Sequence, residues 1–300
     1  AGLDPRLAYR CASLNPAVYL GLDREIGAIA PGRLADIVFL KNIRNPTPSK
    51  VMVEGKILYE NGKPNIRFAF PENIKKWGMM ERTYHFVVGE HDFAWFPPGR
   101  TEADRAVQIP VIELINSVIT VYRNQTFQID DGGFPVIGDD SRLAFVYLID
   151  RQGTWITGGI LGGFTRSLEA IASSLSVEGN LLVIGKSKKA MALAVNRVCE
   201  LGGGLVAVDR GKIAEEMALP WLGMMSLEPV AEVIRKSERI LSLLQTKGFT
   251  HLDPFYGMLF LSMTHLPNVR LTSKGIIYVK SGKILAPSRP LKLNMRVNNS

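Results

Sequence analysis

Apolar runs of strand length alternate with amphipathic stretches along the second half of this chain of 300 residues. Apolar runs of four to eight residues bounded by turn residues predict buried strands, here at 144–149, 181–184 and 204–208. Apolar positions at helical spacing predict helices at 167–174, 188–201 and 228–247. This alternation predicts an α+β or α/β domain over residues 106–300.

The predicted helix at 228–247 has the clearest periodicity. Its apolar positions recur three, four or seven residues apart and form one stripe: Val230, Val233, Ile234, Ile240, Leu241 and Leu244. A stripe of this kind indicates a helix that lies along a hydrophobic core.

The first 65 residues have a different pattern. Asn15 followed by Pro16 is typical of a helix start, because Asn caps the first turn and Pro tolerates the first helical position. Strands are predicted at 35–40, 49–54 and 56–59, with Glu54-Gly55-Lys56 as a tight turn between the last two. Residues 66–105 are rich in aromatic residues, proline and charge and form a connecting or docking segment. The predicted domains are therefore 1–65 and 106–300, joined by 66–105.

Composition describes an ordinary globular chain. With 46% hydrophobic residues, 300 residues can bury a sizeable core in about two domains. We expect no membrane contact, since no apolar run approaches the roughly 18 residues of a membrane span. The two distant cysteines, Cys11 and Cys199, predict a reducing, cytoplasmic location without disulfides.

The formal net charge of +8 is dispersed along the chain. Its densest cluster, residues 186–189, lies at a predicted helix start without interleaved aromatic residues, which favours a solvated helix end over a nucleic-acid groove. No nucleic-acid partner is predicted.

Common catalytic and metal-binding motifs are missing from the sequence. The four histidines form no His-x-His pair, and Glu90-His91-Asp92 with His85 upstream favours a surface turn, because adjacent residues of an extended segment cannot converge on one ion. There is no Gly-x-Ser-x-Gly elbow, phosphate-binding loop or Cys-x-x-Cys. Gly202-Gly203-Gly204 follows a predicted helix, which is typical of a C-cap. No metal site is predicted within this chain.

Two phrases near the start resemble the amidohydrolase superfamily. They are Ser13-Leu14-Asn15-Pro16-Ala17, and Ile26-Gly27-Ala28-Ile29-Ala30-Pro31-Gly32 continuing through Ala35-Asp36-Ile37-Val38. The resemblance implies that residues 1–65 contain the last helix of a (β/α)8 barrel and part of a small β-sandwich.

The second half resembles bacterial adenine deaminases. The phrases that carry the resemblance, in the family's order, are Ala170-Ile171-Ala172-Ser173-Ser174, Ala194-Val195-Asn196, Leu201-Gly202-Gly203-Gly204, Leu219-Pro220-Trp221-Leu222-Gly223-Met224-Met225-Ser226, Pro254-Phe255 and Leu271-Thr272-Ser273-Lys274-Gly275. The resemblance implies a parent hydrolase that converts adenine to hypoxanthine and ammonia. It also implies a binuclear manganese or iron site whose ligands are not in this chain. The implied partners are the missing N-terminal barrel portion, a purine substrate and further copies in a homo-oligomer.

One loop departs from that family. Where adenine deaminases carry His-Asp-Ser-His-Asn, this chain has Leu175-Ser176-Val177-Glu178-Gly179-Asn180, and an Arg-His pair of the family is Arg151-Gln152 here. The candidate site residues are Glu178 as a general base, with Asn180 and Arg151 as substrate contacts. The favoured alternative is a plain Glu-Gly-Asn turn between a helix and a strand.

Two hypotheses of different classes follow. The favoured one is the C-terminal portion of an adenine-deaminase-like hydrolase, inactive without its barrel. The alternative is a non-catalytic binding or assembly domain, or an amidohydrolase relative acting on another purine or a cyclic amide.

Overall fold

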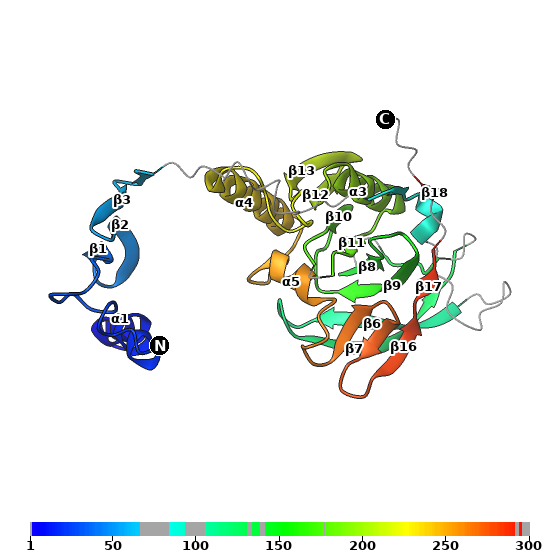
Figure 1. The fold of residues 1–300 in the computed structure, drawn as a ribbon. Coiled ribbons are helices and arrows are strands. Elements are labelled where there is room, and N and C mark those ends of the chain that lie inside the picture. The colour runs from blue at the N-terminus through cyan, green and yellow to red at the C-terminus, as the bar shows by residue number, and fades with distance from the viewer. Residues whose placement is uncertain are drawn as a thin grey trace. The chain divides into compact units, whose positions relative to one another are not determined.

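The computed structural model describes residues 2–66, 84–93, 106–130, 134–138, 142–176, 178–291 and 294–295. The chain forms two compact units, Ala1–Trp77 and Gly78–Ser300 (Figure 1). Each unit has its own sheet, and each is described separately below.

The N-terminal unit contains two short helices and one antiparallel sheet. The helices are α1 (Pro5–Ala12) and α2 (Leu14–Tyr19); the sheet has the order β1 (Ile37–Asn42), β2 (Asn45–Val53), β3 (Lys56–Glu60) and β4 (Lys63–Pro64). The three strands predicted in this region are confirmed. The predicted turn is also confirmed, since Val53 pairs with Lys56 and the two residues between them have φ of 47° and 78°. Positive φ at both central residues suits the right-handed twist of a hairpin.

The predicted cap of α2 was misplaced by two residues. The helix begins at Leu14 with Ser13 at the N-cap, so Asn15 and Pro16 lie inside the first turn. Pro16 is tolerated there because the first four N–H groups of a helix have no partner within it. In α1, the Asp4 carboxylate accepts from Arg6 N at 2.7 Å and Pro5 opens the helix.

The C-terminal unit is built on a nine-stranded sheet. The strands, in sheet order, are β13 (Lys212–Ala218), β12 (Gly204–Asp209), β10 (Ala170–Ser173), β11 (Leu181–Gly185), β8 (Leu143–Ile149), β9 (Trp155–Gly162), β6 (Ala106–Leu114) and β7 (Thr120–Gln128), with β17 (Arg289–Pro290) paired to β9. Every pair is antiparallel except β6 with β9. Mixed α and β structure is as predicted, and the antiparallel pairing selects the α+β alternative.

The prediction of a helix at 167–174 was wrong. Residues 170–173 form β10, which lies between β11 and β12 in the middle of the sheet. All four of its residues are buried. A strand buried on both faces has no alternation of apolar and polar residues, so its periodicity cannot be told from that of a short buried helix.

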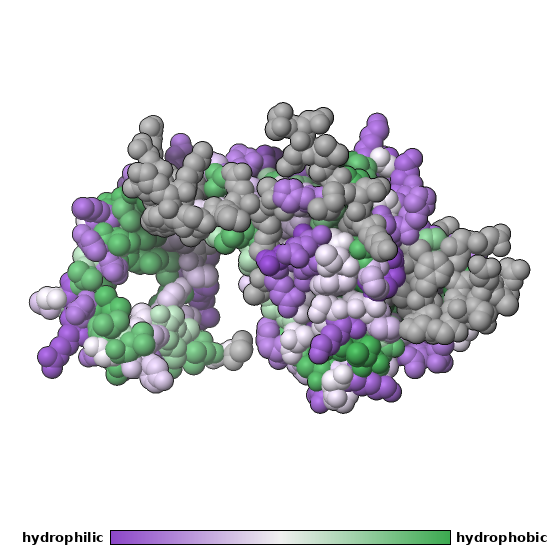
Figure 2. Space-filling model, turned by 45° about the vertical axis from the view of Figure 1, so that its right-hand side comes forward, coloured by the Kyte–Doolittle hydropathy of each residue, from purple (hydrophilic) through white to green (hydrophobic). Residues whose placement is uncertain are grey.

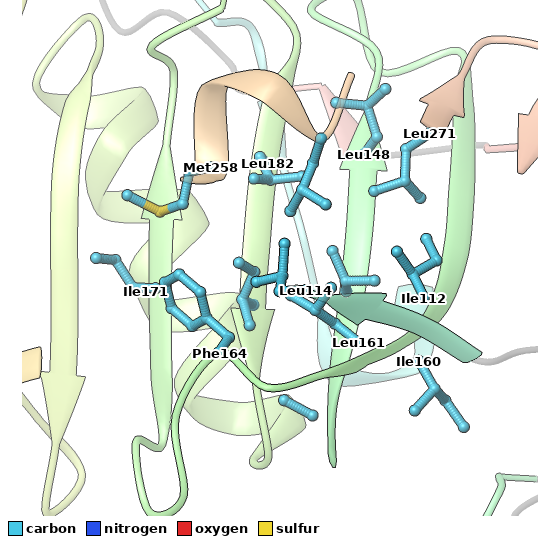
Figure 3. Close-up of a cluster of buried hydrophobic side chains, with 14 of the residues drawn as sticks. Ile112, Leu114, Leu148, Ile160, Leu161, Phe164, Ile171, Leu182, Met258 and Leu271 are labelled. Atoms are coloured by element: carbon cyan, nitrogen blue, oxygen red, sulfur yellow. The ribbon is translucent and has the colours of Figure 1, made fainter. Parts of the chain in front are cut away.

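Two hydrophobic layers cover the two faces of this sheet. One face packs against α3 (Lys188–Glu200), through residues such as Met191, Val195 and Val198. The other face packs against α4 (Val230–Thr246), α5 (Pro254–Phe260) and the small sheet β14 (Val269–Thr272), β15 (Gly275–Tyr278) and β16 (Lys283–Pro287). Figure 3 shows part of this second layer, where Met258 and Leu271 approach sheet residues such as Leu182 and Leu148.

The small sheet approaches β9 closely at Gly159. A Cβ on Gly159 would lie 2.7 Å from the Cδ1 atom of Ile276, closer than real Cβ contacts. Gly159 therefore lets Ile276 of β15 pack directly over the backbone of the large sheet.

The described part of the predicted connecting segment packs on the C-terminal unit. It contains β5 (Phe86–Val87), which pairs with β18 (Asn294–Met295), and a 3-10 turn, η2 (Glu90–Phe93). Tyr84, Phe86 and Phe93 are buried in the α3 layer, and the Tyr147 hydroxyl donates to the Phe93 carbonyl at 2.5 Å. The predicted aromatic-proline run at 94–99 lies outside the described residues.

Helices α3 and α4 match their predicted ranges within two residues. Helix α3 ends in the predicted glycine C-cap, since Gly203 N donates to Val198 O at 2.9 Å and Gly202 N to Cys199 O at 3.2 Å. This pair of bonds satisfies carbonyls that a helix end leaves without partners.

The apolar stripe of α4 is only half covered. Ile240 and Leu244, in the C-terminal half, are fully buried, whereas Val230 is 75% and Ile234 53% exposed. The expectation that the stripe lies along the core therefore holds for Val233, Ile240 and Leu244 and is wrong for Val230 and Ile234. No helix among the described residues is both long and apolar enough to cross a membrane.

Candidate functional site

Four connections meet at one end of the central sheet. Strands β8 and β10 end there at Ile149 and Ser173, and β11 and β12 begin there at Leu181 and Gly204. The register places these ends together, because Ile149 pairs with Leu181 and Ser173 pairs with Leu182 and Leu205. This loop end therefore consists of the connections at 150–154, 174–180, 201–203 and 219–229.

The structure brings the three sequence-predicted site residues together at this end. The Asn180 side-chain amide donates to Glu178 Oε2 at 2.9 Å, and Asn180 Oδ1 accepts from the backbone N–H of Arg151 at 3.3 Å. Asn180 is 5% exposed, whereas Glu178 and Arg151 are exposed. Asn180 thus uses both ends of its amide inside the protein and braces the turn against the 150–154 connection.

The segment 84–93 also contacts this turn. The hydroxyl of Tyr84, which is 3% exposed, donates to the carbonyl of Gly179 at 3.4 Å. Gly179 has a φ of 75°, a conformation that glycine adopts without strain. Val177, in the middle of the divergent loop, lies outside the described residues.

Asp150 is the buried carboxylate nearest to Arg151 in the chain. Its Oδ2 accepts from the Thr154 backbone at 3.2 Å and from the Thr154 hydroxyl at 2.5 Å. These bonds close the connection between β8 and β9 and give Asp150 a structural role.

Ser174 is a residue of this end that sequence reasoning did not single out. Its hydroxyl donates to the Gly223 carbonyl at 2.7 Å and accepts from Gly204 N at 2.8 Å. Its side chain is fully buried. Ser174 therefore ties the start of the candidate turn to the connection at 219–229. The only signal in the sequence was its place in the Ala-Ile-Ala-Ser-Ser phrase.

Close backbone packing reinforces that tie. Gly203 has a φ of 127°, and a Cβ there would lie 2.6 Å from the Cα of Gly223 and 2.7 Å from the Leu219 carbonyl oxygen. Only glycine allows the connection after α3 and the 219–229 connection to touch through their backbones.

The predicted weak metal candidates do not form a metal site in the described part of the chain. Glu90, His91 and Asp92 lie on the 3-10 turn η2, where Asp92 Oδ2 accepts from Gly89 N at 2.8 Å. Among the described residues, no three His, Cys, Asp or Glu side chains are grouped so that they could hold an ion.

A buried cation lies elsewhere in the unit. Arg270 is 1% exposed, and it donates to the carbonyls of Met263, Val118 and Val269 and to the Thr120 hydroxyl. Burial lowers the pKa of its guanidinium to about 10. Its donors hold β14 against the β6–β7 connection, which is a structural role.

Comparisons with known proteins match both parts of the chain. Residues 117–283 match the adenine deaminase C-terminal domain, and residues 1–58 match the amidohydrolase family. Two relatives bear the printed name "putative adenine deaminase". The one from Oceanobacillus iheyensis is 35% identical over 289 residues, which are 96% of this chain and 47% of the relative. The one from Halalkalibacterium halodurans is 33% identical over 293 residues, with the same two shares.

An adenine deaminase of Moorella thermoacetica is 32% identical over 286 residues, which are 92% of this chain and 46% of that protein. The chain therefore spans about half the length of the curated relatives that it matches.

Proposed function

This chain belongs to the family of adenine deaminase C-terminal domains, and we propose that it is the C-terminal portion of a hydrolase that converts adenine and water to hypoxanthine and ammonia. The resemblance predicted from its sequence phrases is confirmed by the family match over residues 117–283. One observation carries the proposal: the match to the amidohydrolase family at 1–58 precedes the match to the deaminase C-terminal domain in the same chain.

The metal of such a hydrolase does not fit the residues described here. Among the described residues, no three His, Cys, Asp or Glu side chains are grouped to hold an ion, and the four connections at the loop end contain no histidine. We propose that the binuclear manganese or iron site lies in an amidohydrolase portion of the native polypeptide, of which residues 1–58 of this chain match a part. The contribution of this chain is then to shape and close the site, and we assign it no step at the metal.

Residues 1–65 are proposed to complete that amidohydrolase portion, with α1 and α2 at the end of its barrel and β1–β4 in its small sandwich. What supports this is their burial: among the described residues of the N-terminal unit, Ala17 alone is buried. Leu3, Leu7 and Tyr19 are more than half exposed, and Figure 2 shows hydrophobic residues spread over the surface. Helices with an exposed apolar face need a further layer to cover it.

The roles proposed for Glu178, Asn180 and Arg151 differ because only Asn180 is buried. Asn180 is proposed to hold the turn, since its amide is used within the protein. Glu178 and Arg151 are the exposed members of the group and are proposed to face the purine. A glutamate that acts as general base contributes about 10²- to 10⁴-fold to the rate.

The test begins with the native polypeptide, whose extent is measured by intact mass and peptide coverage. That polypeptide, loaded with manganese, is assayed for ammonia and hypoxanthine from adenine, beside the 300-residue chain alone. We expect turnover by the native polypeptide only. Replacement of Glu178 by Gln should then lower kcat by about 10²-fold or more if Glu178 is the base, whereas Glu238→Gln, at an exposed position of α4, serves as the control.

Two outcomes contradict the proposal. A native polypeptide without an amidohydrolase portion would favour a non-catalytic binding or assembly domain. A metal-loaded polypeptide that contains this portion but leaves adenine unchanged would favour another purine or a cyclic amide as substrate.

A further inference from the structure

Five exposed apolar side chains lie within a short stretch of the chain that Ser174 ties to the candidate turn. We call it the 222–234 surface; its members are Leu222, Met225, Leu227, Val230 and Ile234, each between 37% and 75% exposed. The first three lie on the connection between β13 and α4, and the last two lie one helical turn apart at the start of α4.

Helix α4 has more apolar residues than the C-terminal unit buries. Val233, Ile240 and Leu244 of the α4 stripe pack against the core, whereas Val230 and Ile234 remain exposed. At about 100° per residue, these two exposed residues lie on one edge of the stripe, and the apolar connection precedes them in the chain. Exposed apolar patches mark surfaces that bind a partner.

The connection is held in a conformation that costs free energy. Leu222 has a φ of 55°, a left-handed value that is uncommon for any residue with a Cβ. The Ser174 hydroxyl bond to the adjacent Gly223 carbonyl and a bridge between Trp221 and Met225 fix it there. An exposed apolar side chain on a strained, well-braced backbone is consistent with a position held for an intermolecular or interdomain contact.

Charge does not oppose such a contact. The acidic and basic groups that flank the surface are paired with one another: Lys236 Nζ lies 2.5 Å from Glu228 Oε1, and Arg235 lies 2.6 Å from Glu232. The surface can therefore lose its water without leaving one of these four charges isolated.

We propose that the 222–234 surface docks on the part of the amidohydrolase portion that the 300-residue chain lacks, and so holds the 174–180 turn over its substrate site. This inference rests on the proposed function. The occupant is chosen for two reasons. The curated relatives are about twice as long as this chain, and Ser174 links the surface directly to the turn that the proposed function places at the substrate.

Backbone amide exchange of the native polypeptide, compared with the 300-residue chain alone, tests this directly. We expect the amides of peptides that span 222–234 to exchange at least about tenfold more slowly in the native polypeptide. The docked surfaces must separate before those amides can exchange. A second peptide, around Leu252, is the internal control. Leu252 is 96% exposed and lies away from this connection in the sequence, and its exchange should be the same in both samples.

Val230→Asp and Ile234→Asp in the native polypeptide sharpen the test. Both side chains are exposed, so the unit should still fold, but a charge in an apolar contact should abolish the protection. Leu252→Asp should leave the protection unchanged.

Three results would overturn the docking. They are equal exchange in both samples, protection that survives both aspartate variants, or protection that appears in the 300-residue chain as its concentration rises, which would identify a second copy as the occupant. Adenine turnover is measured on the same samples and separates the two proposals. Turnover without protection refutes the docking alone, and protection without turnover refutes the proposed substrate alone.

Discussion

The two units of this chain contain similar elements but differ in what covers them. In the C-terminal unit, the central strands lie between two apolar layers, and β11 is buried at all five positions. In the N-terminal unit, β2 and β3 contain exposed and half-buried residues, and only Ala17 of the described residues is buried. From this difference we expect the C-terminal unit to be the more stable of the two, because stability depends on apolar surface removed from water and not on regular strand pairing alone.

When the two units are expressed separately, their thermal unfolding should differ most. We expect residues 78–300 to unfold in one cooperative thermal transition, followed by circular dichroism, because their sheet has a core on each face. Residues 1–77 should show no cooperative transition, since they bury too little apolar surface to offset the entropy of ordering their backbone. A sharp transition in residues 1–77 would contradict the interpretation that this unit depends on a partner.

Truncation of isoleucines inside and outside the core should give the next largest difference. Ile184→Ala, at a fully buried position, should lower the free energy of unfolding by about 2–5 kcal/mol. Ile213→Ala in β13 and Ile57→Ala in β3, both more than a third exposed, should each cost less than about 1 kcal/mol. Urea unfolding of the whole chain measures all three. A loss at Ile57 as large as that at Ile184 would mean that the N-terminal unit has a core of its own.

Ser174→Ala tests the brace between the candidate turn and the 219–229 connection. The variant leaves Gly204 N and the Gly223 carbonyl without the hydroxyl partner that each has now, so we expect a loss of about 1–3 kcal/mol. Ser288→Ala, which removes an exposed hydroxyl bonded to the Ser273 carbonyl, is the control and should cost less than about 0.5 kcal/mol. Equal effects would show that the brace contributes no more than a surface bond.

Tyr147 should make the C-terminal unit sensitive to alkaline pH. Burial raises the pKa of its hydroxyl above the usual value of 10.0. The folded state therefore keeps a proton that the unfolded state loses, so stability is unaffected below about pH 10 and falls as pH rises further. In Tyr147→Phe this extra loss should be absent, although the bond to the Phe93 carbonyl is also lost, at a cost of about 1 kcal/mol at neutral pH.

Stability against pH, measured by urea unfolding between pH 8 and about pH 11, checks this sign. Tyr256→Phe, at a half-exposed position, is the control and should keep the alkaline loss of the parent chain. If Tyr147→Phe loses as much stability at alkaline pH as the parent chain, other groups cause the alkaline sensitivity.

Elements with a local signal were predictable. The Glu54-Gly55 turn, the glycine C-cap of α3 and the apolar runs of β8 and β11 each depend on residues within a few positions of one another. The site residues Glu178, Asn180 and Arg151 could be named because they stand where a family phrase departs from its pattern. Their contacts could not be predicted, because Arg151 is 29 residues from Asn180 and only the β8–β11 pairing brings them together.

Other features depended on packing across the sheet. Ala170–Ser173 forms a strand because β11 and β12 pair with it and both of its faces are covered, which its short sequence does not show. The role of Ser174 likewise needs Gly204 and Gly223, which are 30 and 49 residues away.

The sequence by itself determined the family of this protein, the alternation of its elements and the absence of a His-x-His pair, because these depend on residue identity and short spacing. Only the tertiary structure decided which residues of the α4 stripe are covered, which serine braces the turn and which unit has a core. The physical reason is that burial depends on the layers that long-range pairing places over an element, and the same apolar residue is core where a layer covers it and a binding surface where none does.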